Sequence, residues 1–335
     1  MKQQLEETST QPIKLRVTVV SVLIVVNVFV WVFASYLWFN AGDMPPERTN
    51  DFVMAREIAI PLRSDAIDTQ LSFSLQLIDT NLELASTHAL LMNLNTGEVL
   101  FNHRGNEQAY PASITKIMTV LLGIIYSETE TVVVHADFGA LIGSGASMAG
   151  FVYGETRTLS VILHGSFLSS GADATTALAY HVAGSYQEFV DMMNAKARQL
   201  GMENTNFMNA SGLHHEDQYT TAYDIALLVD YALNYSAFRA IFTRETYQFV
   251  DFWGNHHEMR STMRRLMPVS YFHGGNILGG KVGFTNPAGL CFASIATNGA
   301  NEFLLITFGA QPLYGINPHI NDAFAIYEYF LNPEN

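Results

Sequence analysis

The longest uninterrupted apolar run of the chain lies near its N-terminus. Residues 17–39 carry no charged side chain, and a helix of that length would span roughly 34 Å, enough to cross the hydrocarbon core of a bilayer. Lys14 and Arg16 directly precede the run, whereas acidic residues follow it. The apolar run predicts a transmembrane helix over 17–39. The basic flank predicts its orientation, with residues 1–16 in the cytoplasm and everything after residue 40 outside.

A cleaved signal peptide would also begin with a basic flank and an apolar core. The run is longer than a signal core, however, and no small-x-small cleavage site follows it. We therefore expect an uncleaved single-pass anchor in the cell membrane. It should be followed by an extracellular stalk over residues 40–86 and a folded extracellular domain over residues 87–335.

Beyond residue 86, the spacing of apolar residues changes from strand-like to helical and back. Apolar residues flank the turn Asn95-Thr96-Gly97, a pattern typical of a β-hairpin. A second hairpin is expected where residues 288–297 and 302–309 flank a short polar turn, and residues 321–331 should form a final helix. Hairpins at both ends of the domain predict an antiparallel sheet.

Between these hairpins, apolar residues recur at helical spacing. The predicted helices cover residues 112–126, two short segments within 160–184 that break near Ser170-Gly171, residues 186–201 and residues 221–233. Thr221 stands where an N-cap is expected, with Asp224 three residues later. We therefore expect an antiparallel sheet covered by helices, with a helical insertion in the middle of the chain.

Composition excludes several classes of protein. The chain has 335 residues and a net charge of -14, so it offers no basic surface to displace counterions from a nucleic acid, and we expect no nucleic-acid partner. Cys291 is the only cysteine, which excludes an internal disulfide and a cysteine-based zinc ribbon. A small buried apolar role in a strand is expected for it.

Ser113 and Lys116 lie three residues apart at the start of the predicted helix 112–126, and side chains at that spacing share a helix face. Burial disfavours a charged amine, so the pKa of Lys116 should fall until the neutral amine can take a proton from the serine. The helix N-terminus offers the Ser113 N–H as half of an oxyanion hole. Taken alone, the pair also fits a capping serine and a lysine that reaches water.

Two further polar positions follow at long spacing. Ser170 lies in a turn between two predicted helices, and Lys281 lies between glycines ahead of the predicted strand 288–297. Glycines there would let a ligand approach the backbone closely. The chain has Ser-x-x-Lys, then a serine turn about fifty residues later, then Lys-x-Gly about a hundred residues after that. This is the motif order of penicillin-interacting acyltransferases.

From about His88 onward, the chain resembles the serine D-alanyl-D-alanine carboxypeptidases of the low-molecular-weight penicillin-binding-protein type. The segments that carry the resemblance are PASITKIMTV, SGADATTALA, LGMENTNFMNASGL, TAYDIALL and GGKVGFTNPAGLCFAS. The resemblance implies an α+β fold of the β-lactamase/transpeptidase type, an antiparallel sheet covered by helices with a helical subdomain. It also implies peptidoglycan stem peptides as substrate, β-lactams as covalent inhibitors, and neither metal nor cofactor. The chain stops soon after its last predicted helix, so no added C-terminal β-domain or amphipathic anchor is expected.

The resemblance assigns the chemistry to three residues. Ser113 corresponds to the nucleophile, Lys116 to its base and Ser170 to a serine that relays protons. The third residue of the family's second motif is usually asparagine, whereas this chain has Ala172. Loss of that amide should cost about 1 to 3 kcal/mol in positioning the lysine and the substrate carbonyl.

The resemblance assigns substrate binding to one stretch of an edge strand, which holds Lys281, Val282, Gly283, Phe284 and Thr285. Phe284 would supply the second oxyanion N–H, and Lys281 a fixed positive charge at the mouth of the site. Val282 stands where the family usually has threonine, so a hydroxyl that would meet the substrate carboxylate is lost, at about 1.5 to 3 kcal/mol. Both departures together predict activity reduced by about 10² to 10⁴, against the 10⁶ or more that enzymes supply.

Three other functions remain open. A metal-dependent D,D-peptidase could use His214-His215-Glu216-Asp217 with His256-His257, although adjacent loop histidines lack helix-face spacing. A β-lactamase would share the serine, but no convincing deacylating glutamate loop precedes Lys281. A membrane-tethered wall-binding protein would keep the fold without the reaction. Asn-Ala-Ser at 209–211 is interpreted as an ordinary surface feature.

Overall fold

The computed structural model describes residues 82–134, 142, 145–251 and 253–332. The predicted transmembrane helix 17–39, with its flanks as far as residue 81, lies outside the described residues. Within the described ranges, no single helix is long and apolar enough to cross a membrane. One sharply bent pair, Ala222–Leu233 with Ser236–Phe242, passes the same test of length and composition.

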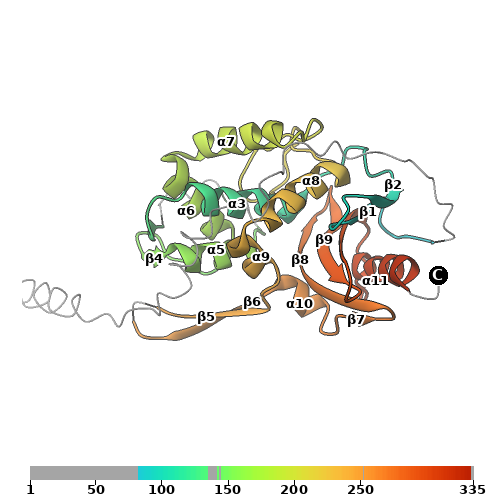
Figure 1. Ribbon diagram of the computed structural model, residues 1–335. Helices are drawn as coiled ribbons and strands as arrows, with labels where there is room; N and C mark the ends of the chain where they lie inside the picture. Colours follow the sequence, from blue (N-terminus) through green and yellow to red (C-terminus); the bar gives the residue numbers. More distant parts are fainter. Residues whose placement is uncertain (1–81, 135–141, 143–144, 252, 333–335) are drawn as a thin grey trace, which may run out of the picture. The chain divides into compact units, whose positions relative to one another are not determined.

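A six-stranded antiparallel sheet in the order β2-β1-β10-β9-β8-β7 organises the described domain (Figure 1). Both predicted hairpins are confirmed, as β1–β2 and β9–β10. Because the chain crosses from β2 to β7 through the helical region, the first and last hairpins meet at the centre of the sheet, where β1 pairs with β10. The strands are β1 His88–Asn93, β2 Val99–His103, β7 Tyr271–Phe272, β8 Gly275–Thr285, β9 Gly289–Thr297 and β10 Glu302–Ala310.

The apolar pattern alone did not predict strand β8, although the family resemblance placed Lys281 to Thr285 on an edge strand. Lys281 lies inside β8 rather than ahead of the first strand of a hairpin, and β8 pairs with β9 from Asn276 to Thr285. Its glycines weaken the strand pattern in the sequence, because glycine has low strand propensity. In the structure, Gly279 allows close packing, since a Cβ atom on it would overlap the carbonyl oxygen of Phe242.

The sheet buries side chains on both of its faces. Successive residues of β1 and β10 alternate between two hydrophobic clusters: Leu90 and Leu304 join the cluster under the central helices, whereas Leu91 and Leu305 join a cluster that includes Tyr327 of the last helix. This period of two places each side chain on the face opposite its neighbour's. It explains why these strands read as nearly continuous apolar runs.

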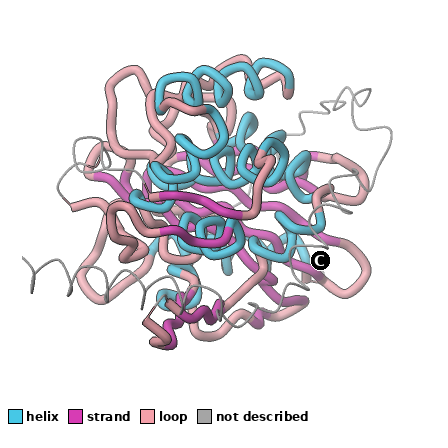
Figure 2. Tube along the Cα trace, turned by 90° about the vertical axis from the view of Figure 1, so that its left-hand side faces the viewer, coloured by secondary structure: helices cyan, strands magenta, loops and turns pink. Residues whose placement is uncertain are grey.

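The helices lie over the strands of the sheet (Figure 2). The predicted helix 112–126 begins with a 3₁₀ turn, Ala112–Thr115, before α3, and the predicted break near Ser170-Gly171 separates α5 from α6. Thr221 accepts a hydrogen bond from the Asp224 N–H, as an N-cap should. The helices are α3 Lys116–Tyr126, α5 Leu159–Phe167, α6 Ala172–Ala183, α7 Tyr186–Gln199, α8 Ala222–Leu233, α9 Ser236–Phe242, α10 Thr262–Leu266 and α11 Pro318–Leu331.

Two small antiparallel pairs complete the described domain. β3 Thr131–Val133 pairs with β4 Thr156–Thr158, and β5 Thr246–Val250 pairs with β6 His256–Arg260. Sheet and helices together confirm the predicted α+β class, an antiparallel sheet covered by helices with a helical region inserted between β2 and β7.

Helix α11 is tied to the segment before β1 by one buried carboxylate. Asp322 accepts hydrogen bonds from the backbone N–H groups of Ala85 and Ser86, at 3.1 and 2.7 Å, and from the Ser86 hydroxyl at 2.6 Å. If the carboxylate is removed, water cannot easily replace it as the acceptor, because the carboxylate and Ser86 are buried. Asp322 therefore fixes the helix against the start of the sheet.

We expect Asp322→Ala to lower the free energy of unfolding by about 2 to 3 kcal/mol, because it leaves buried donors without an acceptor. Chemical denaturation measures this. Glu328→Ala, which removes an exposed carboxylate from the same helix, should change stability by less than about 0.5 kcal/mol. Equal effects of the two substitutions would show that the Asp322 contacts do not anchor α11.

Candidate active site

Ser113 lies in a 3₁₀ turn whose geometry is strained. Ala112, the residue before it, has a φ of 45°, a left-handed value that costs a residue with a side chain about 1 to 2 kcal/mol. Gly212 presses on this turn from the facing loop: with a φ of 81°, it lies so close that a Cβ atom would overlap the Ala112 carbonyl oxygen. Packing between the two segments holds Ser113 in place.

Lys116 occupies the first residue of α3 and is 3% exposed. Its Nζ lies 3.1 Å from the Ser113 Oγ and also donates to the Ser211 carbonyl oxygen. Burial lowers the pKa of Lys116 to about 7, against a smaller opposing effect of the Asp173 carboxylate. A large fraction of the amine is therefore neutral near pH 7, within hydrogen-bond distance of the serine whose proton it would take.

Lys281 and Ser170 form a second buried pair. The Lys281 Nζ donates to the Ser170 Oγ at 3.0 Å and to the Val282 carbonyl oxygen at 2.8 Å. Lys281 is 1% exposed, and burial, followed by the nearby charge of Lys116, lowers its pKa well below the usual value. Lys281 thus lies inside the protein rather than at the mouth of the site, where it was expected, and burial disfavours the charged form of its amine.

Ser170 is the second residue of the site with a left-handed backbone, at a φ of 58°. It lies in the turn between α5 and α6, where the Gly171 N–H donates to the Gly165 carbonyl oxygen. Residues with side chains that are held in this region mark places where the surrounding structure imposes a conformation. Here the imposed conformation directs the Ser170 hydroxyl toward Lys281.

The edge of β8 faces the turn that carries Ser113. β7 pairs only with Gly275 and Asn276, so among the described residues no strand lies beside the rest of that edge. A Cβ atom on Gly283 would lie 2.8 Å from the Ser113 backbone N and 3.2 Å from the Ala112 Cβ. Only a residue without a side chain allows this approach.

The other predicted binding residues differ in where their side chains lie. Val282 is 9% exposed and packs in the cluster on the α11 side of the sheet, whereas Phe284 is 46% exposed. The Thr285 Oγ1 accepts a hydrogen bond from the Ala288 N–H at 3.3 Å, which closes the turn to β9. Val282 thus lies on the sheet face opposite Lys281, as the strand period requires.

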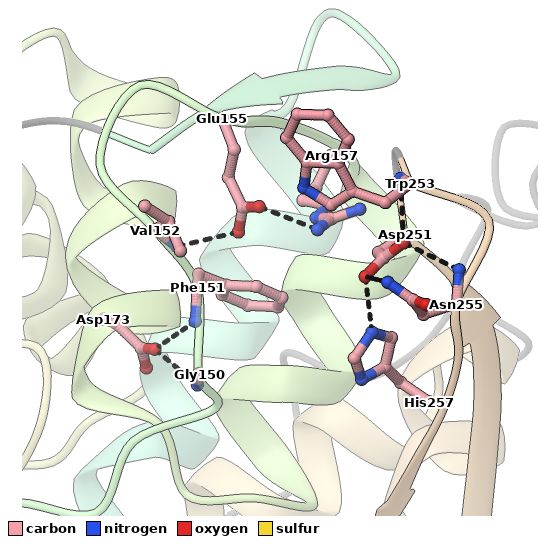
Figure 3. A network of polar contacts seen from close by, with 10 residues as sticks. All are labelled: Gly150, Phe151, Val152, Glu155, Arg157, Asp173, Asp251, Trp253, Asn255 and His257. Carbon is pink, nitrogen blue, oxygen red and sulfur yellow. Dashed lines mark hydrogen bonds and ion pairs between the residues drawn. The ribbon is translucent and has the colours of Figure 1, made fainter.

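Ala172 begins α6 and is buried. The next residue, Asp173, is a part of the site that the sequence analysis missed. Its buried carboxylate accepts hydrogen bonds from the backbone N–H groups of Gly150 and Phe151 (Figure 3) and from that of Ala149, at 2.8 to 2.9 Å. An acidic residue in the first turn of a helix, directly after the altered motif, was the available signal.

Asn-Ala-Ser at 209–211 was interpreted as an ordinary surface feature, and the structure corrects this, because these residues belong to a loop over residues 209–213 that contacts Lys116. The Asn209 Oδ1 accepts from the Gly212 N–H at 2.7 Å, the Ala210 carbonyl oxygen accepts from Thr119 of α3 at 2.7 Å, and the Ser211 carbonyl oxygen accepts from Lys116. The loop therefore forms one wall around the Ser113 and Lys116 pair. The sequence did carry a signal for this role, because the loop lies within LGMENTNFMNASGL, one of the segments that resemble the family.

The histidines considered as metal ligands lie on separate elements. His257 is bound to Asp251 on the β5–β6 hairpin (Figure 3), whereas the His214 ring packs edge-on against Tyr110. Across the described ranges, no group of three or more His, Cys, Asp or Glu side chains is arranged to hold a metal ion. The predicted chemistry instead converges on Ser113, Lys116, Ser170 and Lys281.

Comparison with known proteins places this arrangement in context. A family profile described as peptidase S11, D-alanyl-D-alanine carboxypeptidase, matches residues 76–312. The D-alanyl-D-alanine carboxypeptidase DacF of Bacillus subtilis is 33% identical over 251 residues, which cover 73% of this chain and 63% of DacF. The D-alanyl-D-alanine endopeptidase of Escherichia coli is 28% identical over 294 residues, which cover 84% of this chain and 87% of that protein.

The fold has close counterparts among solved structures. The crystal structure of the Streptomyces K15 DD-transpeptidase matches with a TM-score of 0.67 and 25% identity, over 75% of this chain and 98% of that one. A D-alanyl-D-alanine carboxypeptidase from Mycobacterium tuberculosis matches with a TM-score of 0.65 at 24% identity, over 76% of this chain and 94% of that one. The chain spans only 56% to 63% of the length of the carboxypeptidases DacF, DacC and DacA that it matches.

Gly212→Ala tests the contact that presses on the Ser113 turn. Gly184 provides a matched control, since it has a similar φ of 76° but nothing within 4 Å of an added Cβ atom. We expect Gly184→Ala to cost about 1 to 2 kcal/mol of stability, from its backbone alone. Gly212→Ala should cost at least about 2 kcal/mol more, because the new methyl group overlaps the Ala112 peptide. Equal losses in thermal unfolding would contradict the close contact.

Proposed function

Because the chain belongs to the D-alanyl-D-alanine carboxypeptidase family, we propose that it is a serine peptidase that hydrolyses the D-Ala-D-Ala end of peptidoglycan stem peptides. The observation that carries the proposal is the distance of 3.1 Å between the Lys116 Nζ and the Ser113 Oγ, at a buried amine whose pKa is about 7. A serine becomes a useful nucleophile when such a base stands beside it. Neither metal nor cofactor takes part in the proposed reaction.

In the first half of the reaction, the Ser113 Oγ attacks the carbonyl carbon between the two D-alanines. Its proton passes to the neutral amine of Lys116. The peptide C–N bond then breaks, the leaving amino group takes up a proton, and the rest of the peptide stays on Ser113 as an ester. The Lys281 amine donates to the Ser170 Oγ at 3.0 Å, which supports a role for the Ser170 hydroxyl in passing the proton to the leaving amine.

In the second half, water attacks the ester, and the bond to Ser113 breaks with return of a proton to its Oγ. Negative charge develops on the carbonyl oxygen in both halves and needs N–H donors that are already in place. The Ser113 N–H, near the edge of β8 at Gly283, is one proposed donor and the Phe284 N–H is the other. β-Lactams would acylate Ser113 by the same attack and stay bound as covalent inhibitors.

The apolar segment 17–39 supports a cell-membrane location. In this proposal, residues 1–16 are cytoplasmic, residues 40–86 form a stalk, and the domain over 87–335 faces the extracellular side, where peptidoglycan lies. A single anchor would keep the peptidase close to newly made wall.

Ala172 and Val282 favour a peptidase rate below that of relatives with the usual motifs, because Ala172 lacks an amide and Val282 lacks a hydroxyl that could hydrogen-bond the substrate. They are also the observation behind a second candidate function, a wall-binding protein that retains the fold without the reaction. The contact between Lys116 and Ser113, at a buried amine, supports the enzyme over the wall-binding protein.

Acylation by a labelled penicillin separates the two functions. We expect the label on the peptide that contains Ser113, located by mass spectrometry, and its loss in Ser113→Ala. Lys116→Ala should remove labelling nearly as fully, because nucleophile and base act as a unit. Ser127→Ala is a control, since Ser127 follows α3 outside the site. No label on the wild-type protein would favour the wall-binding function, and label on another serine would refute the assignment.

The pH dependence of that acylation follows from the state of Lys116. The amine acts as a base only when neutral, and burial lowers its pKa to about 7. The second-order rate constant should therefore rise about tenfold per pH unit below pH 7 and level off above it. Stopped-flow or quenched labelling between pH 5 and about 9 measures the profile. A rate that still climbs toward pH 10 would indicate an ordinary lysine and contradict the proposed base.

A further inference from the structure

A peptide attacked by Ser113 would lie beside the end of β8, because Gly283 borders the Ser113 turn. In a terminal D-Ala-D-Ala, the leaving residue ends in a carboxylate. A carboxylate taken from water needs a cation or several hydrogen-bond donors to replace its hydration. In a site for a terminal carboxylate, the groups around the end of β8 would have to supply this cation or these donors.

Side chains on β8 itself offer little to an anion. Val282 ends in methyl groups, and its small exposed fraction of 9% is apolar surface. Phe284 presents an exposed ring. The Thr285 hydroxyl already accepts from the Ala288 N–H, so it retains one proton to donate, which makes it the single side-chain donor of this stretch.

Two cationic side chains on or against β8, Lys281 and Arg264, are buried and bound to other groups. The Lys281 amine donates to the Ser170 Oγ and the Val282 carbonyl oxygen, and burial favours its neutral form. Arg264, which packs under β8, points its guanidinium at the Ile277 and Leu278 carbonyl oxygens and pairs with Glu245 at 3.0 Å. The exposed His214 ring, which packs against Tyr110, is a further ionisable group near the turn.

Apolar side chains gather at the same end of the sheet. Phe284 pairs with Leu290, and Leu290 pairs with Ala310, so the segment after β10 starts about 10 Å from Phe284, two strand spacings away. That segment exposes Leu313, Tyr314 and Ile316, held by a bridge between Leu313 and Ile316. This surface fits an uncharged peptide chain better than a carboxylate.

We infer that the site takes substrates whose leaving amine bears no neighbouring carboxylate, so that it cleaves an internal or amide-capped D-Ala-D-Ala bond at least as fast as the terminal one. This inference rests on the proposed function. The covalent step is unchanged: the Ser113 Oγ forms the ester, the C–N bond breaks, and the proton goes to the leaving amine. What changes is the leaving group, an amino amide or a longer peptide in place of free D-alanine.

Two peptides that differ only at the C-terminus test this, one ending in Lys-D-Ala-D-Ala and the other being its C-terminal amide. Release of D-alanine or D-alaninamide by the full chain gives kcat/KM for each. A site that binds the carboxylate through one hydrogen bond would favour the free acid by about tenfold or more. We expect the amide to be cleaved at least as fast. A preference for the free acid of about threefold or more would overturn the inference, whereas a smaller one supports it.

A substitution at the edge strand makes the comparison sharper. Val282→Thr should shift the ratio of the two kcat/KM values toward the free acid by about tenfold, because a hydroxyl replaces one methyl group of this partly exposed side chain. Val250→Thr, the same change at an exposed position of the β5–β6 hairpin, should leave both values unchanged. If the wild type prefers the free acid and Thr285→Val or His214→Gln removes that preference, the carboxylate is bound by that residue and the inference is wrong.

Failure of the proposed function can be distinguished from failure of this inference by acylation. If neither peptide is cleaved, the rates at which benzylpenicillin and its methyl ester label Ser113 provide the same comparison. Labelling by the ester at a rate within about threefold of the acid supports the inference, and a larger preference for the acid overturns it. Absence of label from both compounds would overturn the proposed function, and the inference with it.

Discussion

The burial of one amine determines how the rest of this site is arranged. Lys116 is 3% exposed, yet its nearest partners are a serine hydroxyl and a backbone carbonyl rather than a carboxylate in direct contact. A lysine in this position is costly as a cation and stable as a neutral amine. The fold places this amine beside Ser113 and lowers its pKa by burying it.

The elements around Ser113 come from distant parts of the chain, and strain appears where they meet. The loop over residues 209–213 covers α3 from one side and presses Gly212 against Ala112, which is held at a positive φ. The edge of β8 approaches the same turn through Gly283. On the third side, Ser170 is held in a left-handed conformation and bonded to Lys281. Such strain persists only where surrounding contacts over-determine the geometry.

The local part of this arrangement could be predicted from sequence. Ser113 and Lys116 are three residues apart, so a helix brings them together without any knowledge of the fold, and the apolar positions of that helix indicate that the lysine is buried. The two outer hairpins and the break before α6 also follow from local patterns. These features depend on contacts within a few residues.

The remaining features depend on contacts between distant segments. Lys281 was expected as a cation at the mouth of the site, and its burial depends on contacts with distant segments that a glycine-rich stretch does not reveal. Asp173 and the 209–213 loop were missed because their partners, at 149–151 and at Lys116, are supplied by the tertiary fold. The direct test of the account is the titration of Lys116 itself. The chain has five lysines, so isotope-labelled lysine side chains give few NMR signals, and Lys116→Arg identifies the relevant one. A midpoint near pH 7 is the result that burial predicts, whereas titration near pH 10 would show a solvated ammonium and contradict the central claim.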